Sequence, residues 1–219
     1  MFHYDRGLFL TRPRLAVDVR RRQKLGFVSH AHADHMARHE TALCTPATGQ
    51  LYRLRMGAAR AVREMPYREP IELGEARLTT YPAGHCLGSA MLLVEIGDRS
   101  LLYTGDFKLE PSATAEAAEL PRADILIVES TFGDPRYRRR PREEAIAELC
   151  ELVGETLRAG ATPVVHAYVL GKAQEVTRIL SDAGFAVLQH ELVYEVSEVY
   201  AACGADLGNY AKWPGYAKH

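Results

Sequence analysis

The sequence lacks long hydrophobic runs and closely spaced cysteines. None of its apolar stretches approaches the roughly 18 consecutive residues that mark a membrane-spanning helix. The first ten residues also lack a basic stretch followed by an apolar one, so we expect no secretory leader. The cysteines, Cys44, Cys86, Cys150 and Cys203, are far apart, which excludes a CxxC metal or redox pair. We therefore expect free thiols and a cytoplasmic location, where the environment is reducing.

The sequence also has almost no net charge. Its 27 basic and 28 acidic residues leave a formal charge of −1. A nearly neutral protein has no general attraction for nucleic acid, so such a role would need local basic patches. Repeats and low-complexity tracts are absent. The remaining composition, 47% hydrophobic and 25% charged, is typical of a globular protein. At 219 residues, the chain can form one large domain, or one domain and part of another.

Short apolar runs separated by turn residues dominate the first part of the chain. Gly97 and Asp98 predict a hairpin turn between two of these runs. Residues Ala47–Gly57 predict a helix that Thr45 caps. The expected strands are Leu15–Asp18, Leu25–Ser29, Ala76–Tyr81, Ala90–Ile96, Ser100–Thr104 and Asp124–Glu129.

After Pro141 the pattern changes to an alternation of strands and helices. Apolar residues recur there at helical spacing, and Gly160 ends the first helix. This alternation predicts a small parallel sheet. The expected elements are a helix through Ile146–Leu157, a strand at Pro163–His166, a helix through Ala173–Ala183, and a further strand and helix through Val187–Tyr200.

A cluster of histidines directly follows one of the expected strands. Residues 29–35 read Ser-His-Ala-His-Ala-Asp-His. Imidazole and carboxylate groups are preferred ligands of zinc and similar ions. Because side chains alternate along an extended segment, His30 and His32 project to the same side. Asp34 and His35 fall where we expect the chain to turn into a helix, so they can face a second ion. We predict a metal site rather than a surface histidine patch.

Two further residues fit the same site. His85 lies in Pro82-Ala-Gly-His-Cys-Leu-Gly-Ser89, where flanking glycines allow a close approach of backbone and ligand. Asp106 lies just past a strand, in Tyr103-Thr-Gly-Asp-Phe107, and its two oxygens can bridge two metal ions. Alone, each would be interpreted as a turn residue. Together with the cluster, both are predicted ligands.

At these residues the sequence resembles the metallo-β-lactamase fold superfamily. The spacing His30-x-His32-x-Asp34-His35 is similar to its signature, and His85 and Asp106 match its next two ligand motifs. The resemblance implies an α/β fold, an αββα sandwich, with two zinc ions at one edge. It implies that a hydroxide between the ions attacks phosphorus, and that Asp34 orients this nucleophile or accepts its proton. In the implied ligand set, His30, His32 and His85 hold the first ion, Asp34 and His35 hold the second, and Asp106 bridges them.

Two more segments resemble the β-CASP branch of this superfamily, whose members are nucleases acting on RNA or DNA. They are Ile127-Val-Glu-Ser-Thr-Phe-Gly133 and Ala167-Tyr-Val-Leu-Gly-Lys-Ala-Gln-Glu175. The likeness runs from Leu8 to Tyr216 and is nearest to ligase-associated DNA exonucleases and RNA-processing exonucleases. It implies phosphodiester hydrolysis of single-stranded DNA or RNA in DNA repair or RNA processing, with a DNA ligase or helicase as partner.

The resemblance also implies supporting residues around the ligands. Glu129 would act as the acidic residue that fixes a ligating histidine. Ser130 or Thr131 are alternative supports for His35, and the sequence does not choose between them.

The chain departs from the β-CASP pattern at its end. Two further histidines of that branch have no counterpart, since His166, His190 and His219 lie in other contexts. The resemblance therefore implies a metallo-β-lactamase domain over residues 1–130 and a partial β-CASP segment over 131–219. It also implies a truncated C-terminus and an incomplete second metal site.

Two basic runs are candidates for nucleic-acid contacts, although such runs are usually solvated faces. One extends from Arg136 to Arg142 and contains Tyr137, which can stack on a base. The other extends from Arg20 to Lys24. Lys172 follows a glycine at an expected helix start, a suitable place for a phosphate. The predicted nucleic-acid contacts are Arg138, Arg140 and Lys172.

Two other functions remain open at this point. One is the hydrolysis of a small thioester or lactone by the same fold. The other is a non-catalytic binding module. The segment from Glu129 to Gly133 favours the nuclease, because small-molecule hydrolases lack that insert.

Overall fold

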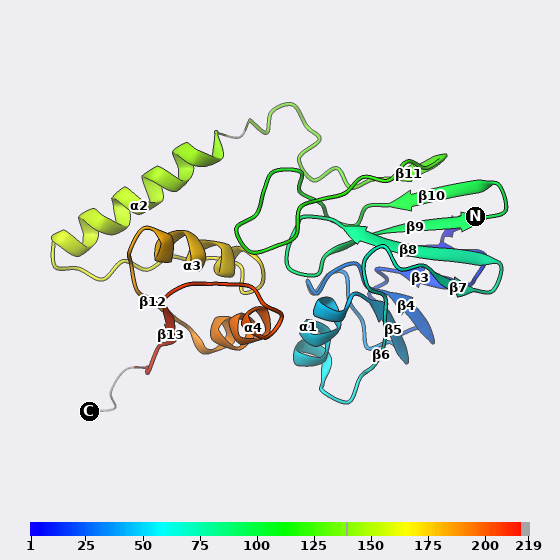
Figure 1. Cartoon of the computed structure of the whole chain (residues 1–219), viewed down its shortest axis with the longest axis horizontal. Helices are drawn as coiled ribbons and strands as arrows, with labels where there is room; N and C mark the ends of the chain where they lie inside the picture. The colour runs from blue at the N-terminus through cyan, green and yellow to red at the C-terminus, as the bar shows by residue number, and fades with distance from the viewer. Residues whose placement is uncertain (139, 216–219) are drawn as a thin grey trace.

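The computed structural model describes residues 1–138 and 140–215 (Figure 1). The strands are β1 Phe2–Tyr4, β2 Leu8–Leu10, β3 Leu15–Val17, β4 Leu25–Phe27, β5 Thr41–Cys44, β6 Ala61–Glu64, β7 Ile71–Leu73, β8 Ala76–Pro82, β9 Ala90–Ile96, β10 Arg99–Tyr103, β11 Ile125–Ile127, β12 Val187–Gln189 and β13 Tyr210–Lys212. The helices are α1 Pro46–Met56, α2 Arg142–Arg158, α3 Lys172–Asp182 and α4 Glu191–Ala202.

Two sheets stacked face to face form the larger part of the molecule (Figure 1). The first has the strand order β1-β2-β3-β4-β5-β6, and the second has the order β11-β10-β9-β8-β7. Apolar side chains from both sheets meet between them, among them Leu15 and Phe27 from the first and Leu78, Leu92 and Leu101 from the second, all fully buried. Burial of each such side chain stabilises the fold by about 1.5–3 kcal/mol. This mixed α/β sandwich confirms the predicted fold class.

The outer faces of the two sheets are covered differently. Helix α1 packs on the first sheet, and the Thr45 hydroxyl accepts a hydrogen bond from Thr48 N at its start, which confirms the predicted cap. The connection between β10 and β11 covers the second sheet, where Phe107 and Ala118 pack against its buried residues. The edge of the sandwich that carries the histidines lies between α1 on one side and this connection on the other.

The C-terminal helices share a core with the sandwich rather than forming a separate one. Leu170, Val196 and Tyr200 are buried in the same cluster as residues of β5 and α1. The Tyr200 hydroxyl also accepts a hydrogen bond from Leu87 N at 3.2 Å. This packing brings the segment before α3 against the loop that carries His85. The domain boundary at residue 130 stays a prediction.

Several predicted elements are confirmed. Seven of the eight expected strands correspond to β3, β4, β8, β9, β10, β11 and β12, and the four helices predicted by residue range correspond to α1–α4. The hairpin is present, since Arg99 pairs with Ile96 and Gly97 has a φ of +59°. Strands β1, β2, β5–β7 and β13, of three or four residues each, were missed.

Two local predictions were wrong. The segment Pro163–His166 is not a strand, because no described strand pairs with it, and Val164 is 75% exposed. The parallel pairing in this region instead joins β12, which is the strand expected from Val187, to β13. The chain after His35 turns toward β5 without forming the expected helix.

The remaining general predictions concern the cysteines, membrane-spanning helices and location. The four cysteines are free, with Cys44 and Cys86 buried and the others half-buried. Within the described residues, no helix is both long and apolar enough to cross a bilayer. The cytoplasmic location stays a prediction. Arg139, within the basic run from Arg136 to Arg142, lies outside the described residues, as do Tyr216 and His219.

Candidate metal centre

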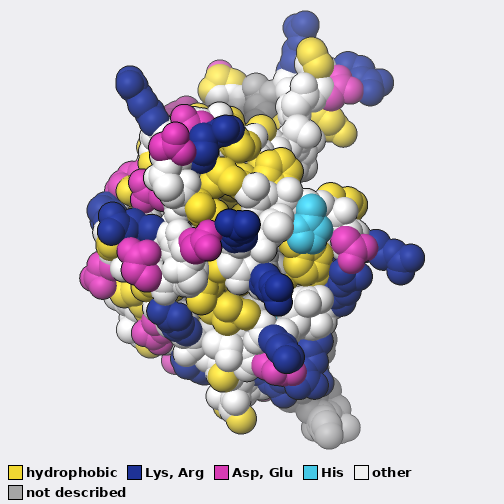
Figure 2. All heavy atoms as spheres, turned by 90° about the vertical axis from the view of Figure 1, so that its right-hand side faces the viewer, with side chains coloured by type: hydrophobic (Ala, Val, Ile, Leu, Met, Phe, Trp, Pro, Cys, Tyr) yellow, Lys and Arg dark blue, Asp and Glu magenta, His cyan; other side chains and the backbone are white. Residues whose placement is uncertain are grey.

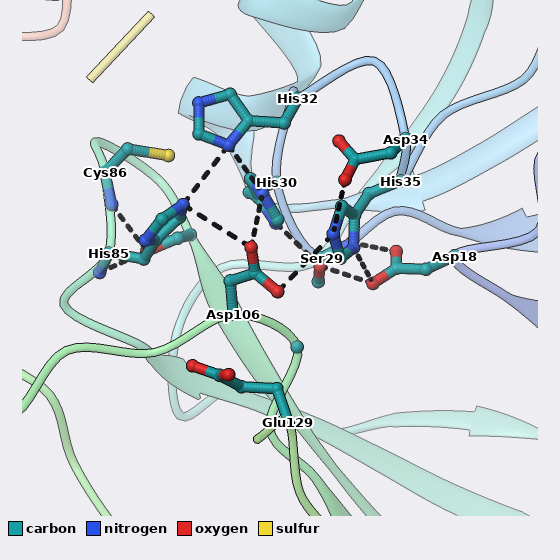
Figure 3. Close-up of polar contacts among 12 residues, drawn as sticks. Asp18, Ser29, His30, His32, Asp34, His35, His85, Cys86, Asp106 and Glu129 are labelled. Carbon is teal, nitrogen blue, oxygen red and sulfur yellow. Dashed lines mark hydrogen bonds and ion pairs between the residues drawn. The ribbon is translucent and has the colours of Figure 1, made fainter. Parts of the chain in front are cut away.

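The predicted ligands gather because their strands end at one edge of the sandwich. His30 follows β4, His85 follows β8 and Asp106 follows β10. Strands β8 and β10 both run antiparallel to β9, so their carboxyl ends lie at the same side of the second sheet. Asp18 follows β3, which is parallel to β4. Residues far apart in sequence thus reach one small volume (Figure 3).

Three histidines turn ring nitrogens toward one another. His32 Nδ1 lies 2.9 Å from His30 Nε2 and 3.2 Å from His85 Nε2. With a carboxylate oxygen of Asp106, these form a set of ligand atoms that all lie within 4.8 Å of one another. His30 and His32 therefore direct ring nitrogens to the same side, although they lie beyond the end of β4.

Asp106 lies between this set and a second group of polar side chains (Figure 3). Its Oδ2 is 3.8 Å from both His30 Nε2 and His85 Nε2. Its Oδ1 is 3.4 Å from His35 Nε2, and Asp34 Oδ2 lies 3.7 Å from that same nitrogen. The two oxygens of one carboxylate therefore face two different sets of donors.

Asp18, which the sequence analysis missed, supports both sets from behind. Its Oδ2 is 2.9 Å from His35 Nδ1 and also accepts hydrogen bonds from the Ser29 and Tyr103 hydroxyls. Ser29 Oγ lies in turn 3.0 Å from His30 Nδ1. Asp18 adopts a left-handed φ of +48°, an uncommon conformation outside glycine. The sequence signal that could have identified Asp18 is its place at the end of an expected strand, next to the ligand-bearing strand.

His32 is oriented by a residue from the C-terminal segment. Its Nε2 lies 3.1 Å from the Leu170 carbonyl oxygen. A carbonyl accepts only, so this contact places the His32 proton on Nε2 and leaves Nδ1 as a lone pair aimed at the centre. Gly171 follows with a φ of +87°, and a Cβ there would lie 3.2 Å from Cys86 Cβ. The C-terminal segment thus completes the wall of the centre.

The electrostatics divide the histidines into two kinds. Burial first, and then the neighbouring histidines, lower the pKa of His30 well below its ordinary value. The same causes lower the pKa of His85 to about 4. Burial would also lower the pKa of His35, but its hydrogen bond to Asp18 and the nearby carboxylates outweigh this and raise it. Burial raises the pKa of Asp106.

These residues fit a metal ion. His30 and His85 are held neutral, so each can present a lone pair rather than a positive charge. Converging imidazole nitrogens 2.9 and 3.2 Å apart offer few mutual hydrogen bonds, whereas a cation among them would use every lone pair. Nitrogen and oxygen donors of this kind suit zinc and several other divalent ions.

The residues expected to support the ligands from β11 behave differently. The half-buried Glu129 carboxylate accepts a hydrogen bond from Thr131 N at 2.7 Å, and its described contacts include no hydrogen bond to a histidine. Its negative charge nevertheless acts on His85 and Asp106, near which it lies in Figure 3. For His35, Asp18 takes the place of Ser130 and Thr131.

The predicted nucleic-acid contacts lie in two places. Arg138 and Arg140 are exposed in the connection between β11 and α2, where Arg140 pairs with Glu148. Lys172 opens α3 and pairs with Glu175. These three residues stay predictions as contacts.

The second basic run is largely balanced by acidic neighbours. Arg21 pairs with Asp5, and Arg22 pairs with Glu40. Figure 2 shows one face of the molecule on which basic and acidic side chains are interspersed. A solvated surface accounts for this run.

Comparisons with known proteins agree with this geometry. A family described as the beta-lactamase superfamily domain matches residues 8–167. A protein named "Probable DNA ligase" from Opitutus terrae is 37% identical over 203 residues, which are 92% of this chain and 20% of that protein. Transcription termination factor FttA from Pyrococcus abyssi is 40% identical over 112 residues, 49% of this chain and 17% of that one. Endoribonuclease ysh1 from Schizosaccharomyces pombe is 36% identical over 123 residues, 55% and 16% respectively.

The chain thus spans a fifth or less of the length of these relatives. A crystal structure of a protein of unknown function from Enterococcus faecalis V583 is similar in fold, with a TM-score of 0.55 and 16% identity. That likeness covers 89% of this chain and 52% of the other. The matched region contains every predicted metal ligand, and the chain belongs to the metallo-β-lactamase superfamily, with relatives in its β-CASP nuclease branch.

Proposed function

We propose that this chain is a zinc-dependent hydrolase that cleaves phosphodiester bonds of nucleic acid. The observation that carries the proposal is the position of Asp106, whose Oδ2 faces His30 and His85 while its Oδ1 faces His35. A carboxylate shared between two sets of donors suits a pair of ions. Membership of the superfamily supports a metal-dependent hydrolase.

The proposed ligand sets follow the two sides of Asp106. His30, His32 and His85 would hold the first ion, and Asp34 and His35 would hold the second, with Asp106 shared. Divalent ions bound there supply Lewis acidity that makes water more acidic and stabilises negative charge on phosphoryl oxygens. The second set has fewer protein ligands, so we expect the weaker affinity there.

The chain's own side chains would then position the reactants. Asp34 is 66% exposed at its side chain and lies beside His35, so solvent and substrate can reach it. We assign it the role of orienting the attacking water and accepting its proton. Glu129 lies close enough for its charge to act on His85 and Asp106. We assign Glu129 the role of adjusting, through its negative charge, the pKa values of His85 and Asp106.

The substrate class rests on the relatives and on local charge. One relative is named an endoribonuclease and another a probable DNA ligase, so both RNA and DNA are candidate substrates. Arg138, Arg140 and Lys172 are the proposed contacts with the strand. The likeness to part of a ligase-named protein also supports a DNA ligase as partner.

The proposal is tested by metal analysis and cleavage assays on one set of proteins. The wild-type chain should contain zinc and cleave labelled single-stranded DNA or RNA. His30→Ala should lose both metal and cleavage, because it removes a fully buried ligand. His166→Ala is the matched control, since His166 is exposed and lies outside the cluster.

Three outcomes would count against the proposal. A chain that binds no metal, and in which His30→Ala changes nothing, would be a binding module. A chain that cleaves a thioester or lactone but no phosphodiester would be a small-molecule hydrolase. Full activity with a metal other than zinc would overturn the metal assignment alone.

A further inference from the structure

Three cationic side chains converge on a single buried carboxylate next to the metal centre. Glu175, in the first turn of α3, has a side chain that is only 8% exposed. Its Oε1 lies 3.1 Å from Lys108 Nζ and 2.6 Å from an Arg142 guanidinium nitrogen. Its Oε2 lies 3.0 Å from Lys172 Nζ. These three cations come from three different segments of the chain.

The charges in this cluster do not balance. Burial alone would raise the pKa of Glu175, but hydrogen bonds from Arg142 and Lys172 outweigh it and lower this pKa to about 2, so the carboxylate is ionised at neutral pH. It can neutralise one of the three cations. Within the described residues, Lys108, Arg142 and Lys172 form ion pairs with no other carboxylate. The cluster therefore carries an excess of positive charge.

The excess charge is fixed beside the proposed ligands. Lys108 follows Asp106 by two residues, and its backbone N–H bonds to Ala83 O, two residues before His85. Lys172 follows Leu170, whose carbonyl contacts His32, by two residues. Two residues of chain span at most about 7 Å. Figure 1 shows the connection that follows β10 reaching toward α3.

The cations are ordered yet still accessible. Their side chains are 20%, 28% and 57% exposed for Lys108, Arg142 and Lys172. The shared carboxylate holds them in one place, so an arriving anion need not order three flexible side chains. Lysine and arginine donors are the usual partners of phosphate oxygens.

We propose that Lys108, Arg142 and Lys172 form a phosphate subsite, which holds a backbone phosphate of the strand next to the one at the metal centre. This inference rests on the proposed function for its choice of a nucleic-acid strand as ligand. Glu175 is a positioning residue in it, because it acts on the strand through the cations. A second role for the same cluster, joining α2 and α3 to the end of β10, is purely structural and makes different predictions.

The test measures strand binding at a series of salt concentrations. The probe is a short fluorescent single-stranded oligonucleotide with phosphorothioate linkages that resist cleavage, read by anisotropy. Lys172→Gln should weaken binding about fivefold, the order expected for one partly exposed ion pair. It should also reduce the slope of log affinity against log salt by about 0.7, the value for one phosphate contact on a single strand.

The control variant is Lys212→Gln. Lys212 lies in β13, its side chain is about as exposed as that of Lys172, and it pairs with Glu191 of α4. It should leave both affinity and slope unchanged. Glu175→Gln should lower the melting temperature and steepen the salt dependence, because it releases the cations from their only carboxylate. If Glu175→Gln does not fold, the affinity and salt dependence of Lys172→Gln still test the subsite.

The subsite is overturned if Lys172→Gln binds the strand like Lys212→Gln. It is also overturned if Glu175→Gln lowers the melting temperature with unchanged binding, which is the result of a structural cluster. Because anisotropy reads binding alone, a chain that fails to cleave any strand would refute the proposed function and leave this test intact.

Discussion

Replacing Asp18 with asparagine keeps the shape of the side chain but should move the proton of His35 from Nδ1 to Nε2. Asp18 Oδ1 accepts from Ser29 N, a group that can only donate, so the asparagine oxygen must stay there. The new amide nitrogen then takes the position of Oδ2, 2.9 Å from His35 Nδ1. An amide N–H donates, so Nδ1 must accept and the His35 proton moves to Nε2. That nitrogen lies 3.4 Å from Asp106 Oδ1 and loses its lone pair for a metal.

The expected loss is in metal affinity and in stability. Loss of a residue that orients a ligating histidine typically costs 10–100-fold in metal affinity, about 1.4–2.7 kcal/mol. The weaker of the bound ions should show this loss, because His35 belongs to the less complete ligand set. The free energy of unfolding should also fall by about 2 kcal/mol, since Asp18 is a buried acceptor with charge-assisted hydrogen bonds.

Two measurements check this reasoning. A competition titration with a chromophoric zinc chelator gives the affinity of each ion, and nitrogen-detected NMR of the metal-free protein reports which His35 nitrogen carries the proton. Tyr103→Phe is the control, because it removes one hydrogen-bond donor to Asp18 and leaves the carboxylate. If Asp18→Asn retains the proton on Nδ1 and binds both ions as tightly as the wild type, the proposed role of Asp18 is refuted.

Three further predictions concern the buried Tyr200 hydroxyl, the buried His39 and the removal of bound metal. Tyr200→Phe should lower the free energy of unfolding by about 1–3 kcal/mol, because it leaves the N–H of Leu87 unsatisfied; urea unfolding that matches the wild type would contradict this. Burial lowers the pKa of His39 below its ordinary 6.5. Its stabilising contribution is therefore complete above pH 6.5 and is lost as the pH falls toward the folded-state value. His39→Gln should flatten this decline in metal-free protein, and an unchanged pH dependence would exclude His39 as its source. Chelation of the metal should lower the unfolding free energy by about 2.7 kcal/mol at a free ion concentration of 100 times the dissociation constant, and a melting temperature indifferent to chelator would mean that the ions do not bind the folded state preferentially.

The strands and helices were predictable where an apolar run stood between turn residues or where apolar residues recurred at helical spacing. Strand β9 and helix α3 span several periods, so apolar spacing located them. Strand β1 has three residues, and Pro163–His166 looks like a strand but has no partner. A strand forms only where another strand accepts its hydrogen bonds, and local sequence carries no record of that partner.

The local sequence alone identifies most of the candidate ligands. His30, His32, Asp34 and His35 lie within six positions, so the local backbone brings four predicted ligand groups together. Ligand type and side-chain alternation are local properties, and both can be read from a short segment.

The way in which these groups are held and oriented depends on contacts between distant segments of the chain. Asp18 meets a hydroxyl 85 residues away, and His32 meets a carbonyl 138 residues away. Lys108 reaches Glu175 across 67 residues. Such contacts depend on how the two sheets stack and where the C-terminal helices pack. Those arrangements arise from burial summed over the whole core, so no short segment of the sequence contains them.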